Sequence, residues 1–279
     1  MAAQPRLNLY EWGRRGDPAV LYWDGLGGTG LHANEIGPIL AEEFGLWVIA
    51  PDPPGHGRSP AGDAESFRPT RLAETALGLL SDLGIPRAAF LGFSWGGRVG
   101  VWFAARHPER TTALALVEGG HYGSPAPTTL AQATAEARAE REEETFESWD
   151  AFVASERESL RRWTPELEEA HRAIMREEDG RVVPIASAEV VGAIHHASRL
   201  EPVAEAYPGL AAAGVPVLLI VAGRLADESV ARFRAALPQA CVETIPNAIH
   251  DLVSFAPGEI AARVGTFLSR ASNNLLLEP

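Results

Sequence analysis

The chain has 279 residues, enough for one large domain or two small ones. Hydrophobic residues make up 46% of it and charged residues 22%, a composition that predicts a soluble globular protein. The net charge of −13 repels phosphate backbones and anionic lipids, so we expect neither nucleic acid nor a membrane as partner. All 24 basic residues are arginine, which excludes Schiff-base lysine chemistry and a P-loop lysine.

Cysteine content and the N-terminal sequence bear on the compartment. Cys241 is the only cysteine, so the chain can form neither an internal disulfide nor a multi-cysteine zinc site. The first residues contain no apolar run long enough for a signal peptide, and no apolar stretch later in the sequence is long enough to span a bilayer. These features predict a cytoplasmic protein, and they leave its oligomeric state open.

Short apolar runs rich in β-formers alternate with helix-like stretches in the first part of the chain. The expected strands are residues 7–12, 19–23, 46–50, 88–92 and 112–117. The expected helices are residues 34–44, 70–83 and 95–107. Because strand and helix alternate, we expect an α/β fold with a mostly parallel, doubly wound sheet and helices on both faces.

The pattern changes after residue 120. Residues 130–207 are helical in composition and rich in Glu and Arg, and we expect no strand within them. Strand-like runs resume at 215–222 and 242–245, followed by a helix at 259–269. We therefore predict a core formed by residues 1–122 and 208–279, with a helical cap at 123–207. Such an insertion would lie over the carboxyl ends of the strands, where open α/β sheets bind ligands.

A G-x-S-x-G pattern follows the fourth expected strand directly and precedes a helix. It consists of Gly92, Phe93, Ser94, Trp95 and Gly96. A strand that reverses sharply into a helix forces the serine into a strained backbone conformation, and glycines two residues to either side avoid a collision. The serine hydroxyl is then exposed at a helix N-terminus, with the backbone N–H of the next residue placed for an oxyanion. The pattern thus predicts a nucleophile.

Three further segments accompany this elbow in a fixed order along the chain. They are Asp24-Gly25-Leu26-Gly27-Gly28 after the second strand, Asp52-Pro53-Pro54-Gly55-His56-Gly57-Arg58-Ser59 after the third, and Asn247-Ala248-Ile249-His250 after the last. Together the four segments resemble the α/β-hydrolase family, over about residues 7–269. The resemblance implies Ser94 as nucleophile, His250 as base, and the backbone N–H groups of Leu26 and Trp95 as oxyanion donors. It implies neither a metal nor an organic cofactor.

The acid of the triad has two candidates. Asp227 follows the strand at 215–222, and the chain order Ser, Asp, His then matches the family. Glu118 ends the strand at 112–117 and is the alternative, because some members of the family take their acid there. Asp227 is the preferred assignment. Two departures, Asp24 where many members have His and Ile249 where the usual residue is Gly, leave the subfamily open.

Two other kinds of site receive less support. Residues 25–30 satisfy G-x-G-x-x-G and Asp52 ends the next strand, as in a dinucleotide-binding fold. However, Asp52 belongs to the proline- and glycine-rich loop, and a dinucleotide site leaves Ser94 and His250 unexplained. No His-x-x-x-His pair or carboxylate cluster has the spacing of a metal site.

These features predict a serine hydrolase that uses an acyl-enzyme to cleave an ester, lactone or related carbonyl bond of a small, largely apolar molecule. Two alternatives stay open. One is a lyase or carbon–carbon bond hydrolase, since the elbow continues into Gly97-Arg98 as in the menaquinone-pathway synthase. The other is a slow-turnover ligand receptor of the same fold. A small-molecule substrate is the only partner expected, and the cap residues that contact it are not predicted.

Overall fold

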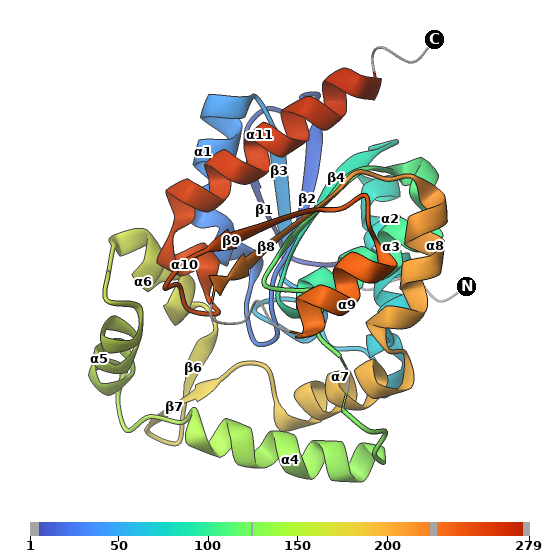
Figure 1. Cartoon of the computed structure of the whole chain (residues 1–279). Coiled ribbons are helices and arrows are strands. Elements are labelled where there is room, and N and C mark those ends of the chain that lie inside the picture. Colours follow the sequence, from blue (N-terminus) through green and yellow to red (C-terminus); the bar gives the residue numbers. More distant parts are fainter. Residues whose placement is uncertain (1–5, 124, 224–227, 276–279) are drawn as a thin grey trace.

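A seven-stranded sheet forms the centre of the computed structural model, which describes residues 6–123, 125–223 and 228–275 (Figure 1). The strand order is β1-β3-β2-β4-β5-β8-β9, and every neighbouring pair is parallel except β1 with β3. The strands are β1 (Leu9–Trp12), β2 (Ala19–Trp23), β3 (Trp47–Pro51), β4 (Ala88–Phe93), β5 (Thr111–Val117), β8 (Val217–Ala222) and β9 (Cys241–Ile245). The predicted mostly parallel α/β sheet is confirmed.

Helices cover both faces of this sheet. One face carries α1 (Ile36–Phe44), α10 (Leu252–Phe255) and α11 (Pro257–Leu275), and the other carries α2 (Pro69–Asp82), α3 (Trp95–Arg106), α8 (Tyr207–Ala213) and α9 (Glu228–Ala236). Alternate residues of each strand therefore enter two separate apolar cores: in β4, Phe90 packs into one and Leu91 into the other. Because both faces are covered, β4 and β8 are buried along their whole length. In the described part of the chain, no helix combines the length and apolar character needed to cross a bilayer.

The elements between β5 and α8 lie on one side of this core, and we refer to them as the cap. It contains α4 (Leu130–Glu143), α5 (Trp149–Leu160), α6 (Pro165–Arg172), β6 (Met175–Glu178), β7 (Arg181–Pro184) and α7 (Ala188–Leu200). Figure 1 shows these elements gathered on one side of the core, with α4 and α7 side by side. A small apolar cluster of Phe152, Val153, Met175 and Val182 joins α5 to the two short strands.

The expectation that no strand interrupts residues 130–207 is wrong. β6 and β7 form an antiparallel hairpin, and Val182 of β7 also pairs with Phe146. The turn between them is Asp179-Gly180, with φ angles of 50° and 76°. Asp-Gly with two positive φ angles is the preferred connection of a two-residue hairpin. The sequence contains this turn dipeptide, but the charged residues of β6 do not show the apolar pattern of a strand.

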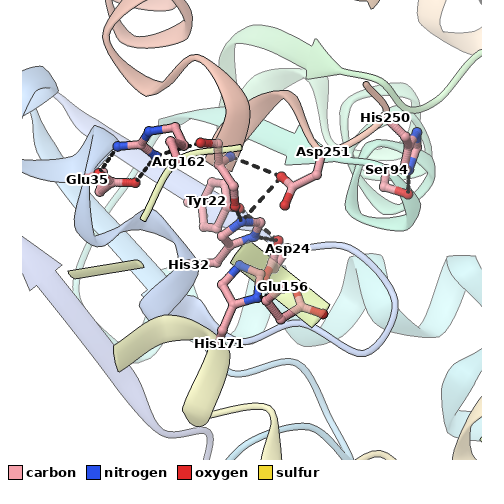
Figure 2. Close-up of polar contacts among 11 residues, drawn as sticks. Tyr22, Asp24, His32, Glu35, Ser94, Glu156, Arg162, His171, His250 and Asp251 are labelled. Carbon is pink, nitrogen blue, oxygen red and sulfur yellow. Dashed lines mark hydrogen bonds and ion pairs between the residues drawn. The ribbon is translucent and has the colours of Figure 1, made fainter. Parts of the chain in front are cut away.

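One arginine fastens the cap to the core. The guanidinium of Arg162, between α5 and α6, donates to both carboxylate oxygens of Glu35, at 2.6 and 2.8 Å (Figure 2). It also donates to the backbone carbonyl of Ser254, at 2.6 Å. A planar guanidinium matches a carboxylate in this two-bond geometry. Arg162 thereby joins the cap to the start of α1 and to α10 of the core.

Candidate active site

Ser94 lies at the sharp turn between β4 and α3. Its φ of 49° and ψ of −116° place a non-glycine residue in a strained region of backbone conformation. A Cβ on Gly92 would lie 2.6 Å from the Gly96 carbonyl oxygen, and one on Gly96 would lie 2.0 Å from the Trp23 carbonyl oxygen. Both approaches are too close for any side chain. The steric reason expected for the two glycines is thus confirmed.

His250 connects Ser94 to a buried carboxylate. Its Nε2 lies 2.9 Å from the Ser94 Oγ, and its Nδ1 lies 3.0 Å from Oε2 of Glu118. The His250 side chain is 45% exposed, whereas that of Glu118 is fully buried. The three side chains come from residues far apart in the sequence and form one hydrogen-bonded series. This is the geometry in which an imidazole can take a proton from a hydroxyl.

Glu118 directly follows β5, at the same edge of the sheet where Ser94 directly follows β4. Its φ of 47° makes it a second non-glycine residue with a left-handed backbone at this edge. The carboxylate accepts hydrogen bonds from the Tyr122 hydroxyl and the Ala222 backbone N–H as well as contacting His250. Burial acts to raise the pKa of Glu118, but these three donors outweigh it and hold that pKa below its ordinary value. The group is therefore a carboxylate facing an imidazole.

The preferred acid of the sequence analysis, Asp227, lies outside the described residues. The alternative acid, Glu118, occupies the position beside His250 Nδ1. β5 and β8 are neighbouring parallel strands, so an acid following either one starts from the same edge of the sheet. The order of the triad residues along the chain favoured Asp227, after β8. In the structure, the carboxylate that contacts His250 is that of Glu118, after β5.

Ser94 lies between two cavities. One has a volume of about 370 Å³ and an apolar wall that includes Phe93, Phe146 and Phe152. The other, of about 390 Å³, is more polar and is lined in part by Trp95 and the ionisable side chains Arg98, Tyr122, Glu140, His195 and Arg199. Leu26 and Ser94 line both cavities.

The two expected oxyanion donors belong to loops that meet at Ser94. Leu26 follows Gly25, and a Cβ on Gly25 would lie only 3.2 Å from the Ser94 Cβ. Trp95 is the first residue of α3 and lines the second cavity with Leu26. The backbone around Ser94 is thus supplied by the β2–α1 loop and the N-terminus of α3, the two elements named in the sequence analysis.

Comparison with known proteins decides the family. A family model described as "alpha/beta hydrolase fold" matches residues 18–257. The chain belongs to the α/β-hydrolase family. Solved structures share this fold over nearly the whole hydrolase chain: E-2-(acetamidomethylene)succinate hydrolase has a TM-score of 0.74 at 21% identity and covers 94% of each chain. The enol-lactonase from Burkholderia xenovorans LB400 has a TM-score of 0.71 at 22% identity, covering 94% of this chain and 96% of its own.

Curated relatives match a shorter part of the hydrolase. 2-Hydroxymuconate semialdehyde hydrolase of Pseudomonas putida is 37% identical over 139 residues, 48% of this chain and 47% of its own. 3-Oxoadipate enol-lactonase 2 of Acinetobacter baylyi is 35% identical over 107 residues, 37% of this chain and 38% of its own. The chain thus spans less than half the length of these two relatives.

The residues that resembled a dinucleotide site have structural contacts in this chain. The Asp52 carboxylate is buried and accepts hydrogen bonds from the backbone N–H groups of Gly30 and Arg58 and from the Asn8 side chain. These bonds hold the β3 loop against the β2–α1 loop. His56, in the same loop, is fully buried and stacks on Trp95 with ring centroids 5.5 Å apart.

Asp24, the departure from the usual histidine, holds a second histidine in the α/β-hydrolase. Its Oδ1 lies 3.0 Å from Nδ1 of His32 and accepts a hydrogen bond from the Tyr22 hydroxyl at 2.8 Å. Nε2 of His32 lies 3.4 Å from the Asp251 carboxylate and 2.6 Å from the Ser254 hydroxyl. Burial opposes charge on His32, but Asp24 and Asp251 outweigh it and hold the pKa of His32 well above its ordinary value.

This second cluster shares the first cavity with Ser94 (Figure 2). Asp251 follows His250 directly in the chain, and in Figure 2 its carboxylate points toward His32 and away from Ser94. His171 of α6 completes the group from the cap side. No short motif joins residues 32, 171 and 251, so sequence spacing could not have revealed the cluster.

Proposed function

We propose that the chain is a serine hydrolase that cleaves an ester, lactone or related carbonyl bond of a small molecule. The observation that carries the proposal is the hydrogen-bonded series from Ser94 through His250 to Glu118. A hydroxyl beside an imidazole, with a carboxylate on the opposite ring nitrogen, is the arrangement of nucleophilic acyl transfer. Family membership and the name of one relative, 3-oxoadipate enol-lactonase 2, support the same reaction class.

The proposed reaction has two halves. His250 Nε2 takes the proton from the Ser94 hydroxyl as Oγ bonds to the carbonyl carbon. The ionised Glu118 fixes the ring tautomer and stabilises the imidazolium, while the N–H groups of Leu26 and Trp95 receive the oxyanion. The leaving group departs with the proton from His250. Water then attacks the acyl-enzyme by the same steps, releasing the acid and restoring the serine.

The cavities indicate the kind of substrate. Because Ser94 lies between them, a substrate can place one group on each side of its scissile bond. The first cavity, of about 370 Å³, offers an apolar wall to one of these groups. The second holds Arg98, Arg199 and Glu140, which suit a polar group on the other side. We therefore propose a small carbonyl compound with one largely apolar arm.

Replacing the nucleophile tests this proposal. Ser94→Ala is expected to lower kcat on a p-nitrophenyl ester by about 10⁴-fold, leaving the residual catalysis of binding and the oxyanion hole. The wild-type protein is expected to form a covalent adduct with a fluorophosphonate, and the variant none. Ser81→Ala is the control, because this exposed serine lies on α2, outside both cavities. Full turnover by Ser94→Ala would refute the mechanism.

A carbon–carbon bond hydrolase is the second candidate. Two relatives are named as hydrolases of compounds that are neither esters nor lactones: 2-hydroxymuconate semialdehyde hydrolase and 2-hydroxy-6-oxo-6-phenylhexa-2,4-dienoate hydrolase of Burkholderia cepacia. Steady-state assays with dienoate ring-cleavage products beside simple esters and lactones separate the two reactions by their kcat/KM values. Efficient carbon–carbon cleavage with poor ester hydrolysis would favour the second candidate. Tight binding without turnover would favour a receptor.

A further inference from the structure

The cluster beside the active site has the composition of a metal-binding site. His32, His171 and Asp251 each offer one ligand atom, and these atoms lie within 4.8 Å of one another. The residues come from three distant segments: the turn Gly30–Asn34 after β2, helix α6 of the cap, and the loop before α10. Two imidazoles and one carboxylate are a common set of protein ligands for zinc and related divalent metals.

A carboxylate stands behind each imidazole. Nδ1 of His32 lies 3.0 Å from Oδ1 of Asp24, and Nδ1 of His171 lies 2.7 Å from Oε2 of Glu156 (Figure 2). With Nδ1 of each ring facing a carboxylate, Nε2 of each ring is the nitrogen available to a metal. Metal-ligating histidines almost always donate their other ring N–H to such a partner, which fixes the tautomer and the ring orientation. His32 makes this hydrogen bond to Asp24, and at His171 the Glu156 carboxylate lies beside the same ring nitrogen as an ion-pair partner.

The charges of the cluster also favour a cation. Asp24, Glu156 and Asp251 bring three carboxylates to two imidazoles. In the structure His32 Nε2 contacts the Ser254 hydroxyl, at 2.6 Å, and Asp251, at 3.4 Å. A metal at this nitrogen would displace the proton that the His32 imidazolium carries there, releasing it to solvent, and would replace the contact with the hydroxyl, which can rotate toward another acceptor.

We propose that His32, His171 and Asp251 bind one divalent transition metal of the zinc type in the wall of the active-site cavity. All three residues line the cavity that contains Ser94, so a coordination position left open by the protein faces that cavity. His171 belongs to the cap, whereas His32 and Asp251 belong to the core. The bound metal therefore also fastens the cap to the core. This proposal does not depend on the reaction of Ser94.

Direct metal binding tests the site. The protein is treated with EDTA, desalted and dialysed against micromolar Zn²⁺, and bound zinc is measured by elemental analysis. All proteins carry Cys241→Ser, because this exposed thiol lies 3.9 Å from Glu243 and offers zinc another ligand. We expect one equivalent of zinc, and with Co²⁺ the visible absorption of a coordinated ion. Less than stoichiometric zinc, or a cobalt spectrum identical to that of free Co²⁺, would overturn the proposal.

Variants assign the ligands. His171→Gln is expected to lower zinc affinity at least tenfold, and Asp24→Asn, which removes only the partner of His32, about 10- to 100-fold. His196→Gln is the matched control, since its ring bonds to the Thr128 carbonyl outside the cluster. Circular dichroism checks the fold of each variant. Zinc is expected to raise the Tm of the parent protein and not that of His171→Gln. Equal zinc affinity in His171→Gln and His196→Gln would overturn the site.

Discussion

The buried carboxylate of Glu118 is surrounded by hydrogen-bond partners from three other residues. It is fully buried, yet its pKa lies below the ordinary value because His250, Tyr122 and the Ala222 N–H all approach it. A buried carboxylate without such partners would take up a proton and lose its charge. The residue is therefore suited to stabilise an imidazolium, which is the role we propose for it.

Exchange of this carboxylate for an amide is the test of that role. Glu118→Gln keeps the size of the side chain and removes its charge, so we expect kcat to fall by about 10⁴-fold through loss of the correct His250 tautomer. Asp227→Asn, at the other candidate acid, is expected to retain kcat within a few-fold. Steady-state ester hydrolysis measures both variants. A larger loss of kcat in Asp227→Asn than in Glu118→Gln would identify Asp227 as the acid of the triad.

The residues of the site differ in how far the sequence predicts them. Ser94 and His250 stand in local patterns, so their roles could be proposed from the chain alone. The choice between Asp227 and Glu118 requires the distance from each strand end to His250, which no local pattern contains. The cluster of His32, His171 and Asp251 joins segments separated by 80 positions or more, and sequence spacing gives no sign of it.

At the scale of elements, the cap meets the core through the apolar packing of α7 and through polar contacts. Arg162 makes three hydrogen bonds across this junction, two to Glu35 and one to the Ser254 carbonyl. Its side chain is 28% exposed and that of Glu35 is 14% exposed, so solvent screens the pair only in part. The junction lies beside the cavity wall supplied by α6.

Removing the arginine should loosen the cap. Arg162→Ala is expected to lower the free energy of unfolding by about 1–3 kcal/mol, because it removes both guanidinium donors from the Glu35 carboxylate and leaves it the weaker Thr164 hydroxyl. It should also raise KM, since α6 of the cap lines the cavity. Urea unfolding and steady-state kinetics measure the two effects. Arg138→Ala breaks an exposed pair with Glu189 and is the control, and equal behaviour of the two variants would contradict this view of the junction.

The sequence pattern predicts the helices and strands of the core better than those of the cap. Alternation of apolar strands and helices predicts the parallel sheet because every strand must be buried on both faces. The hairpin of β6 and β7 is exposed along much of β6, so its residues Arg176, Glu177 and Glu178 lack the apolar signal of a strand. Only the Asp179-Gly180 turn indicated it.

At the scale of the whole molecule, one buried histidine links stability to pH. Burial lowers the pKa of His56 from 6.5 to about 4, although a hydrogen bond to the Pro54 carbonyl and the carboxylate of Asp24 act the other way. Below about pH 6.5 the unfolded chain binds a proton at this position, whereas the folded chain does not until about pH 4. The free energy of unfolding therefore falls as pH decreases through this window.

The size of this effect can be measured by difference. A shift from 6.5 to about 4 corresponds to about 3 kcal/mol, since one pKa unit is worth about 1.4 kcal/mol. His56→Gln removes the titrating group. The difference in the free energy of unfolding between wild type and variant should therefore become smaller as pH falls from 6.5 to 4. Urea unfolding at several pH values gives both curves. Parallel curves would show that His56 does not titrate as described.

At position 94 the residue that stabilises the fold and the residue that catalysis needs are different. A residue with φ of 49° and ψ of −116° costs the folded state about 1–3 kcal/mol, and glycine adopts such a conformation freely. Ser94→Gly is therefore expected to raise the Tm while abolishing turnover, which calorimetry and an ester assay on the same sample would reveal. Selecting a mutant library for thermal stability alone would therefore enrich Ser94→Gly, which is stable but catalytically inactive. Each round of such a selection must also assay turnover.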